Sequence, residues 1–403
     1  MNIFSPKRVY LDYASSAPID RRVARVMEDA SRIAWHNPSS LYKESVEASR
    51  LLEQSRLQVG RYFGVHSDEV IFTGSGTESD NLALRGAVNA FRIAYPECTP
   101  HLVVSAIEHS AVLETARMLE QEGCTVTYLT VSSEGVVDPV ELKSALTECT
   151  VLVSVMYANN EIGVVQPIAE IAKAIRHFKK HHDHKEGFPL FHTDAVQAVQ
   201  YLPCAVEKLG VDLLTANGSK IYGPRGIGIL IKRRHVALTP ILSGGNQEFG
   251  LRPGTESLDR VRGIAQALEL CAQVKEREVD RLTVIRDYAF ERIESVFPDV
   301  IINGDRIHRL PNNINISFPG YDSEFLVLEL DAHGISVSSK SACKSTDTHP
   351  SYVLHALRPT HNEQEGSLRI SLGRNTKKSD IDRVINALSR IRTKQERVKS
   401  FVK

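Results

Sequence analysis

The segment TANGSKIYGPRGIGILI, residues 215–231, predicts two β-strands that run in opposite directions. The strands cover residues 211–217 and 226–232, and the Gly/Pro-rich residues between them form a tight turn. Lys220 lies in this turn, after a short polar run and before the glycines. The segment alone leaves three roles open for this lysine: a nucleotide clamp, a covalent anchor for a cofactor, or a surface charge beside a hairpin.

Upstream of this segment, short β-rich runs alternate with longer segments that carry apolar residues at helical spacing. Apolar strands separated by helices are typical of a mostly parallel sheet that is covered on both faces. We therefore expect an α/β fold with a seven-stranded sheet, in which only the last pair of strands is an antiparallel hairpin. The expected strands are 69–74, 101–107, 124–131, 150–157, 188–195, 211–217 and 226–232.

The pattern changes in the last third of the chain. A long charged helix is expected over residues 258–297, and shorter strands and a terminal helix follow it. We predict a large cofactor-binding domain of residues 16–257 and a smaller α+β domain of residues 258–403. The N-terminal segment, residues 1–15, is expected to pack on the smaller domain.

The composition is that of an ordinary globular protein. The 403 residues are 42% hydrophobic and 24% charged, and 49 basic residues balance 49 acidic ones. This balance does not favour nucleic acid or an anionic membrane as a partner. The sequence has no apolar run of membrane-spanning length, and its first residues lack the apolar core of a secretory signal. We expect a cytoplasmic location, without direct contacts to nucleic acid or membrane.

The cysteines do not form a recognisable metal or redox motif, because none of them stand at C-x-x-C spacing. Cys343 lies in a small, polar, loop-like stretch between Lys340 and Lys344, whose ammonium groups favour the reactive thiolate. On these residues alone, a cysteine that happens to lie in a loop is an equally good interpretation. The histidine-rich run 177–187 is interpreted as a solvated loop rather than a metal site. The other cysteines are expected to be inert: Cys98, Cys124, Cys149, Cys204 and Cys271.

Four polar features stand at the ends of expected strands, where open α/β sheets place their ligand sites. The run TGSGTESDN, residues 73–81, ends a strand and opens a helix whose N-terminus suits a phosphate, although helix capping explains it equally well. His109 follows a second strand, Asp194 ends a third, and Lys220 follows a fourth. A capping role competes at Asp194, and capping or packing is the commoner role of a lone histidine.

Together these features match the needs of pyridoxal phosphate: a phosphate cradle, a ring-stacking group, a carboxylate for the pyridinium nitrogen and a lysine for a Schiff base. The spacing between Asp194 and Lys220 leaves room for one helix and one strand, which places both at one edge of the sheet. A P-loop is excluded because its glycines precede the lysine, whereas here they follow it. A dinucleotide site is excluded because Gly223, Gly226 and Gly228 lead into a strand and not into a helix.

Nearly the whole chain resembles the cysteine desulfurases of the NifS/IscS type, which belong to the class-V aminotransferase superfamily of fold-type-I pyridoxal phosphate enzymes. The resemblance implies the fold-type-I architecture, pyridoxal 5'-phosphate as the cofactor, and a homodimer. It rests on many motifs in the right order, each of them weak alone: YLDYASSAP, NPSS, VIFTGSGTESDNLA, EHSAVL, NNEIGVVQPI, HTDAVQ, SKIYGPRGIG, LRPGTES, SSKSACKS, PSYVLHAL and SLRISLGR.

The resemblance also implies a role for each matching residue. Lys220 forms the Schiff base with the cofactor and moves protons, Asp194 pairs with the pyridine nitrogen, and His109 stacks on the ring. Thr255 reaches the phosphate of the other subunit. The remaining cofactor contacts are implied for Gly76, Thr77, Asn160, Gln197, Asn217 and Ser219. The substrate contacts are implied for Asn37, Asn160 and Arg369. A resident metal is not implied.

The implied reaction converts L-cysteine to L-alanine and leaves a persulfide on Cys343, which passes the sulfur to an acceptor protein. The acceptor would be an iron–sulfur scaffold or a tRNA-thiolation enzyme, and Cys343 is also a candidate for transient ligation of an iron–sulfur cluster. Two other functions stay open. One is a selenocysteine lyase or another class-V lyase or aminotransferase, and the other is a non-catalytic scaffold subunit for sulfur transfer.

The chain departs from the family pattern at a few positions. Ser219 stands where a phosphate-binding histidine is usual, and Asn217 stands in place of a usual serine. Lys340 replaces a small residue, Arg225 replaces a common lysine, and the run 177–187 resembles an extension. Since serine and asparagine both donate hydrogen bonds, we expect a weaker or rearranged grip on the phosphate and not loss of the cofactor.

Overall fold

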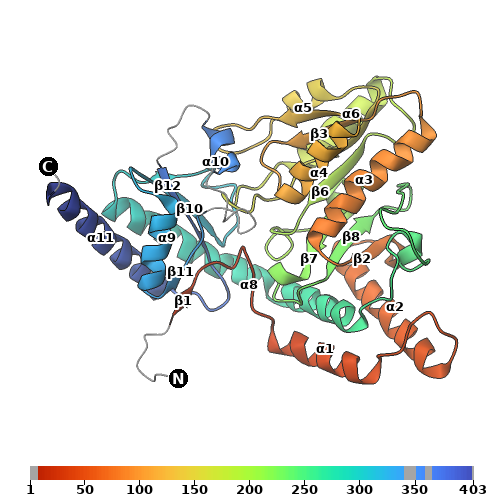
Figure 1. The fold of residues 1–403 in the computed structure, drawn as a ribbon, viewed down its shortest axis with the longest axis horizontal. Coiled ribbons are helices and arrows are strands. Elements are labelled where there is room, and N and C mark those ends of the chain that lie inside the picture. The colour runs from red at the N-terminus through yellow and green to blue at the C-terminus, as the bar shows by residue number, and fades with distance from the viewer. Residues whose placement is uncertain (1–7, 340–350, 359–364, 402–403) are drawn as a thin grey trace.

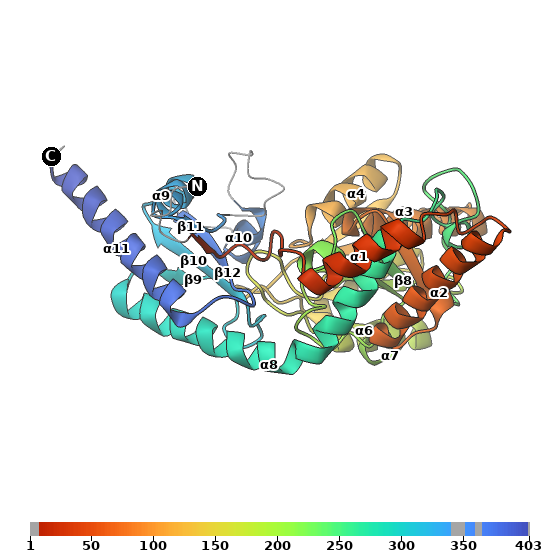
Figure 2. The same ribbon diagram turned by 90° about the horizontal axis from the view of Figure 1, so that it is seen from below.

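A computed structural model describes residues 8–339, 351–358 and 365–401 of the chain (Figure 1). The main features are a seven-stranded sheet, a three-stranded sheet and one long helix, α8 (Leu258–Val296). Figure 2 shows α8 passing beneath both sheets. One end of α8 packs against α1 and α2 beside the larger sheet, and the rest contacts β10 and α11 of the smaller part.

The seven-stranded sheet has the strand order β2–β8–β7–β6–β5–β3–β4. Its strands are β2 (Val70–Thr73), β3 (His101–Ser105), β4 (Thr125–Leu129), β5 (Thr150–Ser154), β6 (Leu190–Asp194), β7 (Leu213–Asn217) and β8 (Gly228–Lys232). Each expected strand is present, and the mostly parallel α/β fold is confirmed. The expected antiparallel hairpin of the last pair is confirmed, but it is not the only antiparallel pairing in this sheet. Strand β8 lies reversed between β7 and β2, which point the same way, so it is antiparallel to both.

Helices cover both faces of this sheet because successive apolar residues of each strand point to opposite faces. On β7, Leu213 joins the core formed with α3 and α4, whereas Leu214 joins the larger core shared with α2, α6 and α8. The helices of this part are α1 (Arg21–Ile33), α2 (Lys43–Phe63), α3 (Gly76–Ala94), α4 (Ser110–Gln121), α5 (Pro139–Ala145), α6 (Ile168–His181) and α7 (Val206–Leu209).

The segment of residues 215–231 forms the expected hairpin of β7 and β8. A 3₁₀ turn, η2 (Gly218–Lys220), follows β7, and the Gly/Pro bend then leads into β8. Gly228 opens β8 so close to the start of α3 that a Cβ atom there would lie 2.4 Å from the backbone of Ser75. Only glycine permits this approach of two backbones.

The smaller part consists of an antiparallel sheet with the order β12–β10–β9 and the helices beside it. The start of the chain is fastened to this part, because β1 (Val9–Tyr10) pairs with β11 (Ile335–Ser336) and Asp12 bridges to Ser371. The remaining elements are β9 (Ile301–Ile302), β10 (Asn313–Pro319), β12 (Glu365–Ser371), α9 (Ser323–Ala332), α10 (Tyr352–Leu357) and α11 (Lys378–Phe401).

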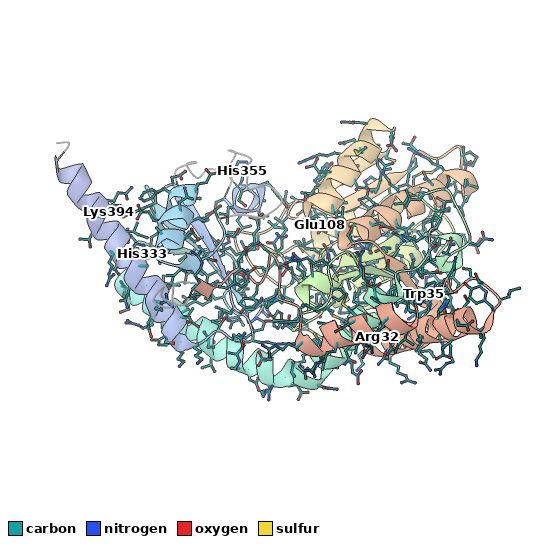
Figure 3. All side chains as sticks on the ribbon, turned by 60° about the horizontal axis from the view of Figure 1, so that its bottom comes forward. Arg32, Trp35, Glu108, His333, His355 and Lys394 are labelled. Atoms are coloured by element: carbon teal, nitrogen blue, oxygen red, sulfur yellow. A yellow bond between two sulfur atoms is a disulfide. The ribbon has the colours of Figure 1, made fainter. Side chains whose placement is uncertain are left out.

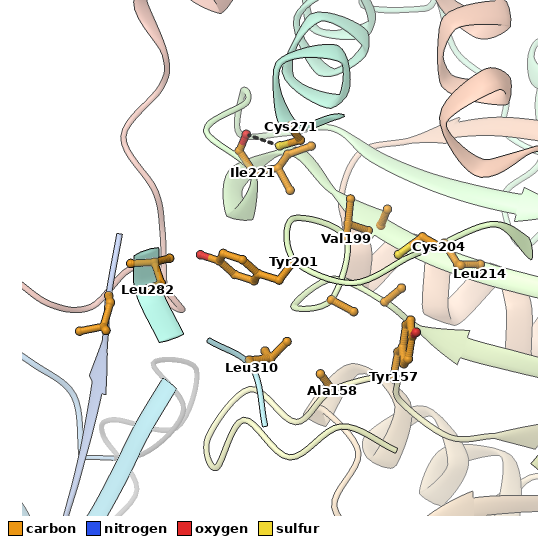
Figure 4. Close-up of a cluster of buried hydrophobic side chains, with 14 of the residues drawn as sticks. Tyr157, Ala158, Val199, Tyr201, Cys204, Leu214, Ile221, Cys271, Leu282 and Leu310 are labelled. Carbon is orange, nitrogen blue, oxygen red and sulfur yellow. Dashed lines mark hydrogen bonds between the residues drawn. The ribbon is translucent and has the colours of Figure 1, made fainter. Parts of the chain in front are cut away.

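One hydrophobic core runs through both parts of the molecule. Figure 4 shows part of this core, where Ile221 lies beside Cys271 of α8 and the Cys271 thiol contacts the Ile221 carbonyl. Burial raises the pKa of the Cys271 thiol to about 11 and that of Cys204 to about 12, so both stay neutral. The core therefore packs against Ile221, the residue that follows Lys220. The expected domain boundary after residue 257 stays a prediction.

The expectation of five inert cysteines requires a correction. Cys98 and Cys149 form a disulfide with a Cα–Cα distance of 6.1 Å, whereas Cys124, Cys204 and Cys271 are buried free thiols. The sequence does not predict the pair, because a separation of 51 residues is not a recognisable spacing. The two loops meet because β3 and β5, which follow them, are neighbours in the sheet.

Candidate active site

A cavity of about 150 Å³ lies at the carboxyl edge of the seven-stranded sheet. Loops from several parallel strands meet there, as is usual for ligand sites in open α/β sheets. The N-terminal segment and the smaller part contribute further walls. Most of the expected site residues line this cavity: Gly76, Thr77, His109, Asn160, Asp194, Gln197, Asn217, Lys220 and Arg369.

The other expected site residues lie elsewhere. The Ser219 hydroxyl bonds to the side chain of Asn217, and Ser219 does not line the cavity. Asn37 and Thr255 are exposed and also stand outside the cavity wall. Cys343 lies outside the described residues. The roles of all the expected site residues, inside and outside the cavity wall, stay predictions.

The N-terminus of α3 forms one end of the cavity. Ser75 caps this helix, and its hydroxyl accepts a hydrogen bond from the Glu78 N–H at 3.1 Å. The first N–H groups of a helix have no acceptor within the helix, and with the helix dipole they favour an anion. Gly76 and Thr77 present this backbone to the cavity. The arrangement suits a phosphate group.

Asp194 and Lys220 both line the cavity. Asp194 is the last residue of β6, and Lys220 ends the turn that follows the neighbouring parallel strand β7. Burial raises the pKa of Asp194 to about 6, while its hydrogen bond from the Val196 N–H and the charge of Lys220 act in the opposite direction. The Lys220 ammonium donates to the carbonyl of Ser15. A cationic ring nitrogen beside Asp194 would favour its charged form.

His109 combines a structural role with a place in the cavity wall. It is the N-cap of α4, and its Nδ1 accepts a hydrogen bond from the Ala111 N–H at 3.1 Å. In the neutral ring, the proton is therefore on Nε2. The capping role that the sequence allows is compatible with a place in the cavity wall, because His109 caps α4 through Nδ1 and also lines the cavity.

Arg369 brings a cation from the smaller sheet to the same cavity. The side chain is buried, and its Nη2 donates to Asp12 Oδ1 at 2.8 Å and to Ser15 Oγ at 2.7 Å. Its Nη1 donates to the Asn160 carbonyl at 3.0 Å. Within the described residues, the Arg369 Nε has no hydrogen-bond partner. An arginine that is fixed in this way suits a carboxylate ligand.

The sequence analysis missed some lining residues, of which Asp80 is chemically the most important. Asp80 is buried on α3, with its Oδ1 3.6 Å from His192 Nε2. Burial, and then the charge of Asp194, raise the pKa of Asp80 well above its ordinary value, while burial lowers the pKa of His192 to about 3. Because Asp80 stands one helical turn after Gly76, it shares the face of α3 that meets the cavity. The other missed residues are Ala14, Ser15, Met156 and Val196.

Glu108 is a further buried acid, which precedes His109, the N-cap of α4, in the chain (Figure 3). Its Oε1 accepts hydrogen bonds from the Met156 N–H at 2.7 Å and from the Ser105 hydroxyl. Burial raises the pKa of Glu108 to about 8 against the effect of these two bonds. Burial thus favours the protonated forms of Asp80 and Glu108.

The donors and acceptors in the cavity fit pyridoxal phosphate. A phosphate fits the N-terminus of α3, a ring nitrogen fits Asp194, and an aldehyde fits Lys220. Buried polar atoms of Asp80 and Asn160 (Oδ1 in each) lack hydrogen-bond partners among the described residues, as does the Nε of Arg369. Such atoms are rare in folded proteins, and they are expected where a polar ligand binds.

Two other kinds of site have no support in the described ranges. Within residues 8–339, 351–358 and 365–401, no helix is both long and apolar enough to cross a bilayer. The same ranges contain no group of three or more His, Cys, Asp or Glu side chains that could hold a metal. In the histidine-rich run, both ring nitrogens of His184 face backbone carbonyls, those of Lys179 and Lys185.

The chain is similar to known proteins over nearly its whole length. Residues 9–384 match the family model of aminotransferase class-V. A protein named cysteine desulfurase IscS, from Dictyoglomus turgidum, is 40% identical over 385 residues, which cover 96% of this chain and 94% of the relative. The solved structure of a NifS-like protein has a TM-score of 0.86 at 30% identity and covers 96% of this chain and 99% of its own. A structure described as SspA in complex with cysteine has a TM-score of 0.75 at 30% identity, with coverages of 90% and 98%.

Proposed function

The chain belongs to the class-V aminotransferase family, and on this premise we propose that it is a pyridoxal phosphate-dependent cysteine desulfurase. It converts L-cysteine to L-alanine and transfers the sulfur to Cys343. One observation carries the proposal: Asp194 and Lys220 meet in a cavity that ends in a phosphate cradle and also holds Arg369. The relatives named cysteine desulfurase support the choice of substrate.

When bound, pyridoxal phosphate supplies an electron sink for the bonds around the substrate Cα. The Asp194 carboxylate keeps the ring nitrogen protonated, which maintains that sink. Lys220 anchors the cofactor through Nζ and afterwards accepts the proton from the substrate Cα. His109 holds a proton on Nε2 and donates it beside the ring. Asp194 is buried and Lys220 and His109 are half-buried, which limits the access of water to the reacting atoms.

Arg369 and Asn160 bind the α-carboxylate of the substrate. Asp12 and Ser15 hold the Arg369 guanidinium by its Nη2, so its orientation is set before the substrate arrives. The Nε of Arg369 then gives the substrate a donor that no residue in the described ranges uses. A fixed, desolvated arginine binds a carboxylate more strongly than an exposed one, because it is already ordered and shielded from water.

The phosphate is held by Gly76 and Thr77 of α3 and by Asn217 of β7. Gln197 contacts the ring oxygen, and its Nε2 also donates to the Ala14 carbonyl at 3.0 Å. Thr255 belongs to an exposed loop and completes the phosphate site of a second copy of the chain. The enzyme is accordingly a homodimer.

Cys343 carries the sulfur. Its thiolate attacks the sulfur of the bound cysteine, so that a new S–S bond forms as the Cβ–S bond breaks. The electron pair of the broken bond stays on Cβ, and a proton completes the methyl group of alanine. The persulfide is then passed to a sulfur-acceptor protein in the cytoplasm, such as an iron–sulfur scaffold or a tRNA-thiolation enzyme.

The test measures alanine formation from L-cysteine and locates the persulfide by mass spectrometry. We expect wild-type protein to carry the extra sulfur on the peptide that contains Cys343, and Cys343→Ala protein to form neither persulfide nor alanine. Cys124→Ala serves as the matched control, because it removes a buried thiol on the amino side of β4. Alanine formation at an undiminished rate in Cys343→Ala would exclude the mechanism. Retained activity of that variant on selenocysteine would indicate a selenocysteine lyase instead.

A further inference from the structure

Asn217 and Ser219 are hydrogen-bonded to each other, and both depart from the family pattern. Asn217 Oδ1 accepts a hydrogen bond from the Ser219 backbone N–H at 2.9 Å and a second from the Ser219 hydroxyl at 3.1 Å. A backbone N–H donates and never accepts, so the atom that it meets must be the amide oxygen. The two bonds therefore fix which end of the Asn217 amide faces the turn.

The other end of the amide, Nδ2, faces the N-terminus of α3. It lies 3.4 Å from the position that a Cβ atom on Gly76 would occupy. The sheet register brings these groups together, because Gly228 of β8 is opposite both Asn217 and Thr73, the last residue of β2. Asn217 lines the cavity and Ser219 does not. The amide thus presents its donor group at the place where the α3 backbone favours an anion.

We propose that Ser219 is a positioning residue for the cofactor phosphate. It does not contact the phosphate itself, and instead holds the Asn217 amide so that Nδ2 donates to a phosphate oxygen. A serine hydroxyl has one proton, and Asn217 Oδ1 already receives it. Because a phosphate only accepts hydrogen bonds, the same hydroxyl cannot serve both groups. This inference rests on the proposed function only for the identity of the anion, pyridoxal phosphate.

The competing arrangement has the Ser219 hydroxyl turn away from Asn217 and bind the phosphate directly. The two arrangements differ in how the effects of two substitutions combine. If Ser219 acts through Asn217, its removal has no further effect once the amide is absent. If Ser219 binds the phosphate independently, the two effects multiply.

The test titrates cofactor-free, full-length protein with pyridoxal phosphate and measures the dissociation constant from the absorbance of the bound cofactor. We expect Ser219→Ala to raise the dissociation constant about fivefold, which corresponds to one hydrogen bond, and Asn217→Ala to raise it about tenfold or more. The double variant should match Asn217→Ala. An unchanged dissociation constant in Ser219→Ala, or a double variant weakened by the product of the single effects, would overturn the proposal.

Controls separate the phosphate contact from damage to the fold. Ser219→Thr keeps the hydroxyl and should bind pyridoxal phosphate within about twofold of wild type. Pyridoxal lacks the phosphate, so Ser219→Ala and wild type should bind it equally, and unequal binding would contradict a role at the phosphate. Ser389→Ala removes a hydroxyl bonded within α11 and should have no effect.

The titration also distinguishes this proposal from the proposed function. If wild-type protein binds pyridoxal phosphate but does not form alanine from cysteine, the desulfurase reaction fails while the dissociation constants still decide the role of Ser219. If wild-type protein does not bind pyridoxal phosphate, both proposals are overturned.

Discussion

The two edges of the seven-stranded sheet are built from the same strands but differ in how their polar groups are satisfied. At the amino edge, His101 is buried and both of its ring nitrogens are hydrogen-bonded, to the Thr150 and Thr127 hydroxyls at 2.9 Å each. The disulfide between Cys98 and Cys149 joins the two loops beside it. Among the described residues of this edge, the buried His101 ring has its hydrogen-bond partners without a ligand.

At the carboxyl edge, by contrast, some buried polar atoms lack hydrogen-bond partners among the described residues. Among the described residues, buried polar atoms of Asp80, Asn160 and Arg369 lack partners in the cavity wall. Each such atom costs about 1–3 kcal/mol when it stays unsatisfied. A fold tolerates this cost where a ligand supplies the missing bonds. The difference teaches that the amino edge contributes stability, whereas the carboxyl edge gives up stability for binding and catalysis.

The largest effect is expected for Lys220→Ala, which removes the reactive amine from the carboxyl edge. Alanine formation should fall by about a thousandfold or more, because both the covalent anchor and the proton acceptor are lost. The measurement is the rate of alanine formation, together with the loss of cofactor trapping by borohydride. The exposed Lys208→Ala is the control. A rate within about tenfold of wild type would contradict the role of Lys220.

The second prediction concerns the amino edge, where Cys98→Ser combined with Cys149→Ser removes the disulfide. The closed loop spans 51 residues, so the free energy of unfolding should fall by about 4 kcal/mol. Alanine formation at 25 °C should be unchanged, because the pair lies at the edge opposite the cavity. Denaturant unfolding without reductant measures the first quantity and initial rates the second. A loss of activity with unchanged stability would contradict the assignment of stability to the amino edge and of catalysis to the carboxyl edge.

The third prediction concerns Arg369→Lys, which keeps the charge but removes the planar guanidinium. The KM for cysteine should rise by about 30-fold with a smaller change in kcat, because charge-assisted bonds to the substrate carboxylate are lost. Initial rates over a range of cysteine concentrations measure both constants. Arg358→Lys, which lies outside the cavity wall, is a control. A change in kcat alone would assign Arg369 to another step.

The smallest effect is expected for Glu108→Gln, which tests whether burial favours the protonated form of the Glu108 carboxyl group. Burial raises the pKa of Glu108 to about 8, so the folded protein keeps a proton that the unfolded chain releases above its ordinary pKa. The stability from this group is complete at low pH and is lost as the pH rises through 8. The variant should therefore melt about 2–4 °C above wild type at pH 9 and close to wild type at pH 4. If the variant and wild type melted at equal temperatures at pH 9 as well as at pH 4, the charged form of Glu108 would not destabilise the folded protein.

Local patterns predict the strands, because each is a short apolar run that ends in polar or glycine residues. They do not predict that β2 pairs with β8, since an apolar run does not indicate its neighbour. Asp194 and Lys220 can be placed at one edge from their spacing. Ser15 cannot be placed, because its contact with Arg369 joins residues 354 positions apart. The disulfide is missed for the same reason.

Asp80 and Ser219 show a different limit. Asp80 lies in a run that helix capping explains equally well, and only the packing of α3 reveals that its carboxyl group faces the cavity. Ser219 can be identified as unusual from the sequence, but its hydrogen bond to Asn217 depends on the geometry of one turn. Motifs thus predict which residues gather at a site, whereas atomic contacts decide what each side chain does there.

The N-terminal segment has a consequence for the synthesis of this protein. Its first described residues pair with β11, and Asp12 then meets Arg369, which lies 357 residues later. A ribosome that adds about 5–20 residues per second needs about 20–70 s to make that length of chain. Asp12 is therefore synthesised long before Arg369, its partner in the folded protein. A nascent chain cannot finish this wall of the cavity before Arg369 has been synthesised, so catalysis cannot begin while residues 12–368 are still being made.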